Sequence, residues 1–589
     1  MRQNFLSLFS ITCFLGQLAF VFDVRGQVSE TEQHPLPRFA TKEERAFAPF
    51  YTPPAAVRIV PPPRAVRTMA EFEELEGIIV RWAYNTQNLL LSQIVDAAQD
   101  EGMVWIITRP GTSDSANIKS YLASRSIPLT NIEFLSIGTN SIWSRDYGPW
   151  CVYDVDTDSM AIVDFRYNRP RPQDDVVPVA LAQLWNLPLY QTVTMPDSLS
   201  HPGGNYMVDG SGRGFASKLI YFENRLQSVE RIDSILLQYN GISSFITMDT
   251  LLYDGIHHID MHMKMLNEET LLVGQYPLNV SDYQRIENTV NYLATLTNSY
   301  GRPYRIIRIP MPADASGRYP PQSYYLTYVN ALIVNKTVLL PVYNLPTDAA
   351  AMQTWREAMP GYRILGFDCN AIIPQSGAIH CIAKEIGVRE PVRIRHKRLW
   401  EVSDTATSYR IEATVRVRSG ADSAFLFWRA DSTASFARVQ MTDSGGVYVA
   451  EVPAQTAGSR VSYFMEATSF SGRRSTFPLV GEAGAFTFTV KSSPTSVPLG
   501  VAGRFRLEHN YPNPFNPSTT IRFEIPASGV VTLKVSDVLG REIATLVERV
   551  LEAGSHTAVL DATRFSSGVY FYTLEWEGKK LSKPMLLLK

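Results

Sequence analysis

The sequence predicts an α/β domain followed by two all-β modules. Short apolar runs typical of buried strands alternate with segments of helical apolar spacing up to about residue 385. The first strand, helix and strand are "GIIVRW", "QNLLLSQIVDAAQDE" and "MVWIIT". From about residue 392 onward only short alternating strand segments appear. Repeated strand–helix–strand order is typical of an α/β fold, and strands without helices are typical of sandwiches.

The later elements of the α/β domain follow in the same order. "TLLVGQY" predicts a strand, "VSDYQRIENTVNYLATLTNSY" an amphipathic helix, and "YRIIRIPMP" a further strand. "ALIVNKTVLLPVY" is typical of a hairpin, "DAAAMQTWREAM" of a helix, and "YRILGFD" of a strand. We expect the domain to span residues 67–388.

The all-β part divides into two modules. "IEATVRVRS", "AFLFWRA" and "RVSYFMEA" predict an Ig-like β-sandwich over residues 392–492. A polar, proline-containing stretch predicts a linker at 493–500. The last module then occupies residues 501–589.

The N-terminus predicts export. Arg2 and the apolar run that follows it are typical of a signal peptide over residues 1–26, and an uncleaved anchor is the alternative. A lipoprotein signal at Cys13 is disfavoured, because Thr12 precedes it and the apolar run continues beyond it. Residues 27–66 are proline-rich and are expected to be extended and without a core.

The overall composition limits the class of partner. Of the 589 residues, 45% are hydrophobic and 19% charged, which is typical of a folded globular protein. A formal net charge of −2 gives no sign of a nucleic-acid surface. No second apolar run approaches the length of a bilayer span, so we expect no transmembrane segment once the signal is removed.

Three cysteines remain after the predicted signal: Cys151, Cys369 and Cys381. An odd number leaves at least one thiol unpaired within the chain, which favours a chemical role in an exported protein. Cys381 in "SGAIHCIAKEIG" begins a short amphipathic segment, where a helix N-terminus could favour the thiolate. The alternative is a small buried cysteine.

One carboxylate stands out in "SIWSRDYGPWCVYD". Asp146 is predicted at the end of a strand, before the turn residues Gly148 and Pro149, and among aromatic side chains. Burying a carboxylate is costly unless something cationic meets it. The motif therefore predicts a cationic partner for Asp146.

A second charged stretch, "DGIHHIDMHMKML", is predicted as a strand. Alternation would place His258, Asp260 and His262 on one face. Three interpretations remain open: a site for zinc or iron, a general acid/base with its charge partner, and an exposed polar face.

A third stretch, "DFRYNRPRP", holds Arg169 and Arg171 between prolines. Because proline restricts the backbone, the two guanidinium groups are fixed in direction and could clamp a carboxylate. The alternative is a solvated surface loop.

Six motifs in one order carry a family resemblance: "WSRDYGPW", "NRPRP", "HPGGNYMVDG", "HHIDMHMKML", "YVNALIVN" and "GAIHC". Together they resemble the Porphyromonas-type peptidylarginine deiminases, which are relatives of agmatine deiminase, over residues 69–385. The resemblance implies the pentein fold, an α/β propeller of five ββαβ-like modules. It also implies catalysis without a metal or another cofactor.

The resemblance implies a role for each matching residue. Asp146 and Asp260 would bind the substrate guanidinium, His258 would act as general acid/base, and Cys381 would be the nucleophile. Three kinds of substrate contact would complete the site: Trp143 along the aliphatic stem, Asn330 beside the reacting groups, and Arg169 with Arg171 on the α-carboxylate of a C-terminal arginine. His257 and His262 depart from some relatives, which keeps the metal interpretation open.

The C-terminal module carries a second resemblance. "NYPNPFNPSTTIRFEIP", "VLGREIATL", "SSGVYFYTL" and the closing "KKLSKPMLLLK" resemble the C-terminal sorting domain of type IX secretion substrates. This implies the type IX machinery as a partner and passage through the periplasm to the cell surface or the medium.

The expected function is that of an exported peptidylarginine deiminase. It would convert arginine in peptides or proteins to citrulline and ammonia through a covalent thiouronium on the cysteine, with C-terminal arginine favoured. One alternative is an agmatine deiminase, which forms N-carbamoylputrescine. An alternative of another class is a surface adhesin whose α/β domain is inert.

Overall fold

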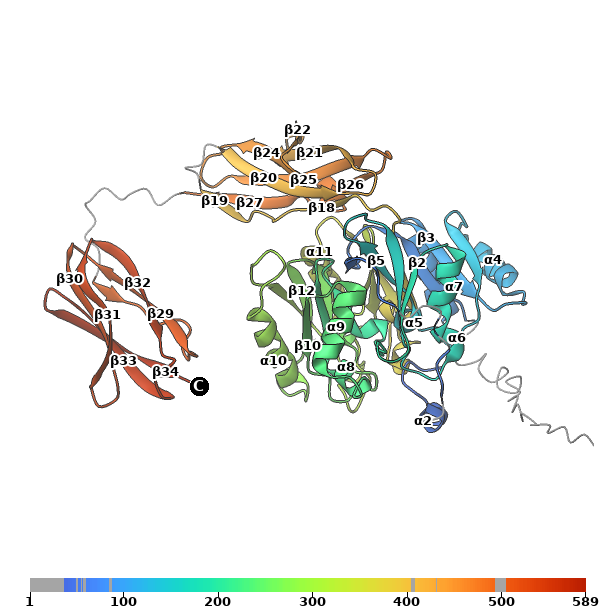
Figure 1. The fold of residues 1–589 in the computed structure, drawn as a ribbon, viewed down its shortest axis with the longest axis horizontal. Helices are drawn as coiled ribbons and strands as arrows, with labels where there is room; N and C mark the ends of the chain where they lie inside the picture. The colour runs from blue at the N-terminus through green and yellow to red at the C-terminus, as the bar shows by residue number, and fades with distance from the viewer. Residues whose placement is uncertain are drawn as a thin grey trace, which may run out of the picture. The chain divides into compact units, whose positions relative to one another are not determined.

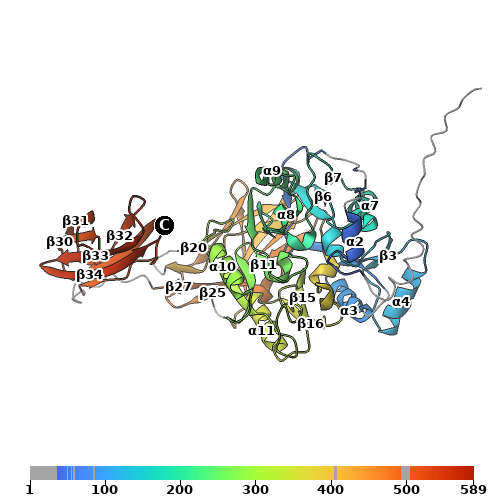
Figure 2. The same cartoon turned by 90° about the horizontal axis from the view of Figure 1, so that it is seen from below.

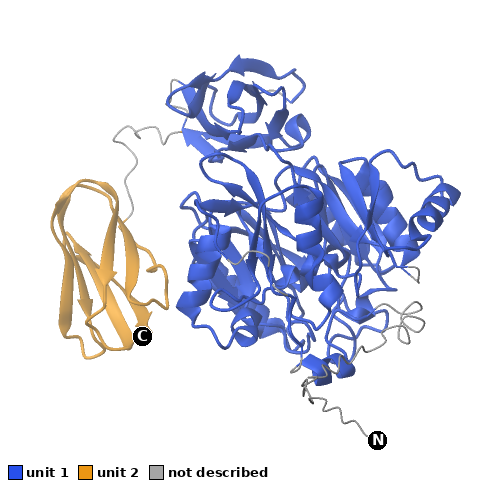
Figure 3. Cartoon of the chain, turned by 45° about the vertical axis from the view of Figure 1, so that its right-hand side comes forward, with its two compact units in different colours: residues 1–491 blue, residues 492–589 orange. Residues whose placement is uncertain are grey.

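The computed structural model describes residues 36–48, 51–54, 56, 60–83, 87–403, 408–430, 432–492 and 505–588. The chain divides into two compact units, residues 1–491 and 492–589 (Figure 3). The predicted signal peptide and the predicted linker lie outside the described residues.

Five small sheets make up the α/β part of the first unit (Figures 1 and 2). Each sheet joins an antiparallel pair to a parallel pair, and helices connect the parallel strands. The repeated unit is therefore ββαβ, as expected, whereas its arrangement as a propeller stays a prediction. Parallel strands need such crossovers because the end of one strand and the start of the next lie at opposite ends of the sheet.

The first two sheets contain four strands each. One has the order β17-β2-β3-β4 and the helices α3 and α4: β2 (Leu75–Arg81), α3 (Asn88–Gln99), β3 (Met103–Thr108), α4 (Asp114–Ser124), β4 (Ile132–Ser136) and β17 (Ala383–Gly387). The other has the order β1-β5-β6-β7: β1 (Val66–Thr68), β5 (Trp150–Asp154), β6 (Met160–Phe165), α6 (Pro172–Asp175), α7 (Val177–Leu184) and β7 (Leu189–Thr192).

The other three sheets contain three strands each. The third holds β8 (Met207–Val208), β9 (Arg213–Ser217), α8 (Leu219–Glu223), α9 (Val229–Asn240) and β10 (Ser244–Met248). The fourth holds β11 (Met263–Asn267), β12 (Thr270–Gln275), α10 (Tyr283–Ala294) and β13 (Arg305–Pro310). The fifth holds β14 (Leu332–Val334), β15 (Thr337–Val342), α11 (Asp348–Ala358) and β16 (Arg363–Asp368).

The first sheet is completed by the last strand of the domain. β17 pairs antiparallel with β2, so that Lys384 lies opposite Ile79 and Glu385 opposite Ile78. The two ends of the α/β domain are thereby hydrogen-bonded to each other. Short connecting segments at the centre of the domain supply the polar residues described below: α5 (Ser144–Tyr147) and the 3-10 turns η3 (Gly203–Asn205), η4 (Ile259–Met261), η5 (Ile373–Gln375) and η6 (His380–Ile382).

Local sequence explains where helix α9 begins and ends. Ser228 caps its N-terminus by accepting a hydrogen bond from the Arg231 N–H. Gly241 ends it with φ of 68°, and a Cβ there would lie 1.7 Å from the Val66 carbonyl oxygen. Glycine is thus required both by the left-handed backbone and by the close approach of β1. The apolar side of the helix packs in the core through Ile232, Ile235 and Leu236.

The N-terminal segment differs from its prediction. Residues 27–66 were expected to be extended and without a core, but the described part contains helix α2 (Lys42–Phe47). Thr41 and Glu44 form a reciprocal capping box at its start. Arg38 is fully buried in the α/β domain. A proline-rich composition predicts the extended backbone but gives no sign that one side chain is bound elsewhere.

The Ig-like part of the first unit is a two-sheet sandwich. One sheet has the order β18-β20-β24-β23: β18 (Arg393–Arg395), β20 (Ser408–Arg416), β23 (Thr442–Asp443) and β24 (Val447–Pro453). The other has the order β19-β27-β25-β21-β22, with β26 on β25: β19 (Glu401–Ser403), β21 (Ala421–Arg429), β22 (Ala437–Gln440), β25 (Arg460–Ser469), β26 (Arg474–Phe477) and β27 (Phe486–Lys491), preceded by the turn η7 (Gly481–Gly484). An ion pair between Arg473 and Glu74, 2.7 Å long, ties this sandwich to the α/β domain.

The second unit is also all β. Its sheets have the orders β28-β29-β32 and β31-β30-β33-β34: β28 (Arg506–Leu507), β29 (Ser518–Ile525), β30 (Gly529–Ser536), β31 (Glu542–Leu551), β32 (Gly554–Asp561), β33 (Gly568–Trp576) and β34 (Lys579–Leu587). Alternate residues of β29 and β30 face its core. Within the described part of the chain, no helix is long and apolar enough to cross a membrane.

Candidate active site

The guanidinium of Arg38 lies between two buried carboxylates. Its Nε and Nη2 donate to Asp146 at 2.7 and 2.8 Å. Its Nη1 and Nη2 donate to Asp260 at 3.3 and 3.1 Å. Asp146 and Asp260 thus hold the planar fork from different edges, which is the geometry that carboxylates prefer for guanidinium. The cationic partner predicted for Asp146 is found in the chain itself.

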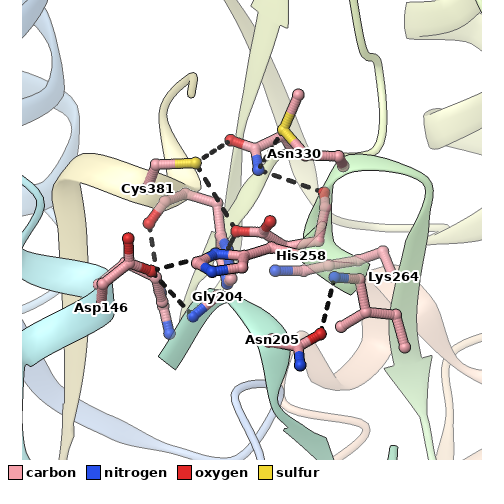
Figure 4. Close-up of polar contacts among 12 residues, drawn as sticks. Asp146, Gly204, Asn205, His258, Lys264, Asn330 and Cys381 are labelled. Atoms are coloured by element: carbon pink, nitrogen blue, oxygen red, sulfur yellow. Dashed lines mark hydrogen bonds and ion pairs between the residues drawn. The ribbon is translucent and has the colours of Figure 1, made fainter. Parts of the chain in front are cut away.

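Asp146 is held by a short helix rather than by a strand end. The prediction of a strand end was wrong: Ser144–Tyr147 form helix α5, and the strand begins only at Trp150. Gly148 ends the helix with an extended backbone, and Pro149 follows it. The Gly204 N–H donates to Asp146 Oδ1 at 3.1 Å (Figure 4). Helix and backbone donor together fix the carboxylate.

Asp260 lies in turn η4 and not on a strand face. Residues 254–266 were predicted as one strand, but the strand begins at Met263 and Ile259–Met261 form a 3-10 turn. Asn205 Oδ1 accepts from the Ile259 N–H at 3.2 Å and anchors this turn (Figure 4). The alternating polar residues of this stretch do not lie along a strand. His258, Asp260 and His262 lie in and beside a compact turn, and all three are buried.

His258 lies beside the carboxylate pair. Its Nδ1 is 3.5 Å from Asp146 Oδ1, and its side chain is buried. His262 is buried as well, and no hydrogen-bond partner of its ring nitrogens is found among the described residues. Within the described ranges, no group of three or more His, Cys, Asp or Glu side chains is arranged to hold a metal ion. The exposed polar face considered for this stretch is wrong because all three side chains are buried.

Cys381 lies next to the same guanidinium. Its Sγ is 2.6 Å from Arg38 Nη1. The thiol also reaches Asn330 Oδ1 at 3.3 Å, and Asn330 Nδ2 donates to the Asp260 carbonyl at 3.2 Å (Figure 4). Asn330 therefore links the cysteine to the turn that carries Asp260. Cys381 belongs to turn η6, directly before strand β17, so the short helical segment predicted to begin at this residue is wrong.

Gly204 forms one wall of the guanidinium site. A Cβ built at this residue would lie 1.7 Å from Arg38 Nη2, closer than atoms can approach. The same atom would lie 2.8 Å from His258 Nδ1 and 2.9 Å from Asp146 Oδ1. Only glycine lets the guanidinium pass this close to the backbone. The "HPGG" motif signalled this residue, but spacing alone did not predict its role.

The charges in the site hold one another in their ionised forms. Burial opposes ionisation of Asp146 and Asp260, but the Arg38 guanidinium outweighs it and holds the pKa of both carboxyls below their usual range. Burial also opposes the charge on Arg38, and the two carboxylates outweigh it and raise its pKa. An unpaired pair of acids at this depth would repel, so the site is built for a cation.

The cysteine and histidine respond to the same charges. Burial raises the pKa of the Cys381 thiol well above its ordinary value, the Arg38 cation works against this shift, and the two carboxylates add to it. Burial and the Arg38 cation lower the pKa of His258, while Asp146 opposes them. The guanidinium thus favours the thiolate of Cys381, but burial prevails and favours the neutral thiol.

A chain of charged residues supports Asp260 from behind. His380 Nδ1 is 2.8 Å from Asp260 Oδ2, and His380 Nε2 is 2.9 Å from Glu71 Oε2. Lys264 Nζ in turn donates to Glu71 at 2.6 Å. Sequence reasoning missed Glu71, His380 and Lys264, because their contacts join distant segments. The sequence signal available was His380 directly before the predicted nucleophile.

Three further predicted residues contact the main chain around Arg38. Trp143 Nε1 donates to the Leu36 carbonyl at 2.7 Å. Arg169 Nε donates to the Arg38 carbonyl at 3.1 Å, and Arg171 Nη2 donates to the Pro37 carbonyl at 2.8 Å. Arg171 is buried, so its loop is not the solvated surface loop considered from sequence. The eight predicted site residues therefore lie around Arg38 and its direct neighbours, and four of them contact Arg38 itself: Asp146, Asp260, Cys381 and Arg169.

The arrangement defines the class of the protein. Two carboxylates bind a guanidinium, a thiol touches it, and an imidazole stands beside it. Such groups attack and hydrolyse a C–N bond of a guanidino compound. Independent comparison agrees: the profile of the Porphyromonas-type peptidyl-arginine deiminases matches residues 67–386, more than half of the chain. The chain belongs to this family, and it is an enzyme acting on guanidino groups.

Two curated relatives are named for agmatine rather than for peptidyl-arginine. A protein of Latilactobacillus sakei named "Putative agmatine deiminase" is 25% identical over 309 residues, covering 47% of this chain and 82% of that protein. A protein of the same name from Shewanella frigidimarina is 25% identical over 303 residues, covering 46% and 80%. The family thus includes enzymes named for a free amine as well as for peptides.

Solved structures share the fold. An X-ray structure described as "putative agmatine deiminase" aligns with a TM-score of 0.50 at 19% identity, covering 56% of this chain and all of that one. The agmatine deiminase of Enterococcus faecalis aligns with a TM-score of 0.49 at 20% identity, covering 57% and 100%. At this identity the first likeness shows a pentein-like deiminase fold.

The second unit belongs to a different class of domain. The profile of the secretion system C-terminal sorting domain matches residues 509–587. The predicted sorting module is confirmed, and it indicates a secreted or cell-surface attached protein that uses a type IX secretion machinery.

Proposed function

We propose that this chain is an exported peptidylarginine deiminase that converts arginine residues of peptides or proteins to citrulline and ammonia. One observation carries the proposal: an arginine within a polypeptide occupies the site. Its guanidinium meets Asp146, Asp260 and Cys381, while Arg169 and Arg171 hold main-chain carbonyls beside it. The five ββαβ modules support a propeller arrangement around this site.

The proposed chemistry begins with the thiol. The cation and His258 favour the thiolate of Cys381, which attacks the guanidinium carbon. The tetrahedral adduct loses ammonia after His258 protonates it, and a thiouronium remains on the cysteine. His258 then removes a proton from water, which attacks the same carbon and releases citrulline. Asp146 and Asp260 keep the positive charge in place throughout.

The main-chain contacts favour a peptide over agmatine. Agmatine has no carbonyl or carboxylate, so Arg169 and Arg171 would contact nothing on it. A C-terminal α-carboxylate in place of the Arg38 carbonyl would receive a charge-assisted hydrogen bond from Arg169, and such a bond is stronger than one to a carbonyl, whereas Arg171 holds the carbonyl of the preceding residue. We therefore keep C-terminal arginine as the favoured substrate and expect internal arginine to bind as well.

One assay on the full chain tests the function. The chain should carry Arg38→Ala, which empties the guanidinium subsite. We expect ammonia and citrulline from a peptide with internal arginine and from one ending in arginine, with slower turnover of agmatine. Preference for agmatine would favour the amine deiminase. No turnover of any of the three would contradict the proposal and favour an inert adhesin.

Arg169→Ala should separate peptide binding from chemistry. Each lost charge-assisted contact is worth about 1.5–3 kcal/mol, or roughly 10- to 150-fold. We expect KM for a peptide ending in arginine to rise by this factor with kcat largely unchanged. The effect on agmatine should be small, because agmatine offers no acceptor to Arg169. Steady-state kinetics of both substrates in the Arg38→Ala background measure the difference, and equal effects on both would remove the clamp.

Activity should survive chelation. The guanidinium itself neutralises Asp146 and Asp260, so a cation at that position would compete with the substrate rather than assist it. We expect unchanged turnover after treatment with excess chelator and dialysis. Loss of turnover that one added metal restores would instead support the metal interpretation of His257, His258, Asp260 and His262.

A further inference from the structure

Residues 36–44, here called the N-terminal strap, lie across the site. Trp143 binds the Leu36 carbonyl, and the Arg38 N–H donates to the Gln375 carbonyl at 3.2 Å. Beyond Arg38, Glu44 forms an ion pair with the buried Arg171, with Nε to Oε1 at 2.6 Å. The strap is therefore held on both sides of Arg38, and it covers the site completely, since Arg38 has no exposed surface.

The hold on Arg38 goes beyond an ordinary buried ion pair. The guanidinium donates four hydrogen bonds to two carboxylates, and these fix its plane. The Cys381 sulfur is in contact with Nη1, and Nη2 lies where a Cβ at residue 204 would be. These are the same groups that the proposed function assigns to substrate. Arg38 thus occupies the position proposed for the reacting arginine of a substrate. Because Arg38 is part of the same chain, it cannot dissociate as a separate substrate would.

We propose that Arg38 is a self-modification site: Cys381 of the same chain converts Arg38 to citrulline. This inference rests on the proposed function and adds a particular substrate to it. Because nucleophile and target are parts of one folded chain, the reaction is first-order and avoids the entropic cost of bringing two molecules together.

The reaction balances without any added reagent except water. The Cys381 sulfur bonds to Arg38 Cζ, and the bond from Cζ to one terminal nitrogen breaks. That nitrogen leaves as ammonia and carries the proton away as ammonium. Water then attacks Cζ, the C–S bond breaks, and the thiol is restored. Guanidinium plus water becomes a neutral ureido group plus ammonium, and nothing is oxidised or reduced.

Conversion of Arg38 to citrulline would weaken the contacts that hold the strap in the site. The ureido group of citrulline carries no charge, so the ion pairs with Asp146 and Asp260 are lost. One N–H donor site is also replaced by a carbonyl oxygen, which two carboxylates repel. The two acids would then be buried without a cation, which is unfavourable. Arg38 conversion therefore favours release of the strap and opens the site to other arginine substrates.

A second arginine, directly after the strap, supplies a control. Arg45 lies in helix α2, seven residues after Arg38, and its side chain is exposed and reaches only the Ala40 carbonyl among the described contacts. If binding in the site decides which arginine reacts, Arg38 is converted and the nearby Arg45 is left unchanged.

Peptide mass mapping of the full-length chain tests the inference. We expect citrulline at residue 38 in nearly all copies of the unaltered chain, arginine at residue 38 in the Cys381→Ala chain, and arginine at residue 45 in both. Isotope-labelled Cys381→Ala chain mixed with unlabelled active chain should keep arginine at residue 38, because conversion occurs within one molecule.

Each other outcome has a definite meaning. Arginine at residue 38 in the unaltered chain, while the Arg38→Ala chain converts a peptide, would overturn self-modification and leave the proposed function intact. Citrulline appearing in the labelled Cys381→Ala chain would overturn the intramolecular step. Equal conversion of Arg38 and Arg45 would overturn the positional argument. If the Arg38→Ala chain converts no arginine substrate, the proposed function fails and the inference with it.

Discussion

Replacing Cys381 with alanine should abolish citrulline formation while the fold is retained. The Cys381 sulfur contacts the bound guanidinium at 2.6 Å, and among the described residues no other thiol contacts it. Removing a nucleophile typically costs on the order of 10⁴-fold or more in rate. Ammonia release from an arginine peptide in the Arg38→Ala background measures the loss, and the thermal unfolding midpoint checks the fold.

The other two mature cysteines supply matched controls. Cys151 lies in strand β5, and burial raises the pKa of its thiol to about 11. Cys369 is also buried, and burial raises the pKa of its thiol. Neither contacts Arg38 among the described hydrogen bonds, so Cys151→Ala and Cys369→Ala should retain turnover. Substantial citrulline from the Cys381→Ala chain would rule out the covalent route.

Gly204→Ala should exclude the substrate guanidinium from an otherwise intact site. The added methyl group would lie 1.7 Å from the position of Arg38 Nη2, which donates to both carboxylates. Losing these two charge-assisted bonds, at about 1.5–3 kcal/mol each, corresponds to roughly 10²- to 10⁴-fold in kcat/KM. The nearest permanent neighbours are side-chain ends of His258 and Asp146, which can shift slightly.

Kinetics and thermal unfolding of two variants decide this prediction. Gly138→Ala is the matched control, because a Cβ there would lie 3.4 Å from Gln173 Oε1, an ordinary contact. We expect Gly138→Ala to keep its activity and both variants to keep their unfolding midpoints. Normal kcat/KM in Gly204→Ala would show that the guanidinium binds in a different position.

The polar motifs of the sequence gave the site more accurately than the local structure around it. The structure brings Asp146, Asp260, His258 and Cys381 together, although they come from segments far apart in the chain. Two of the supporting elements were misassigned: α5 and η4 were read as strand. Both are too short to show a helical period, and tertiary contacts such as Asn205 with Ile259 define them instead.

Arg38 and Glu71 could not have been found from spacing. Arg38 is flanked by a proline-rich composition that predicts only extended backbone, and its role depends on contacts with residues far along the chain. Glu71 is one acidic residue among several near the start of the domain, and its contacts with Lys264 and His380 distinguish it. Side-chain contacts between distant residues produce no periodic pattern in a single sequence. Strands and helices do produce one, and ordered motifs can be recognised directly.

The pairing of β17 with β2 determines when catalysis can begin. Cys381 lies just before β17, and this strand reaches its place only by joining β2, near the start of the domain. The nucleophile consequently meets Asp146 and Asp260 as one of the last steps of chain assembly, and such distant pairings form slowly. A chain that has not yet folded has the carboxylates and the thiol but no assembled site. For a secreted deiminase the consequence is a delay: guanidino compounds encountered before folding is complete are left unmodified.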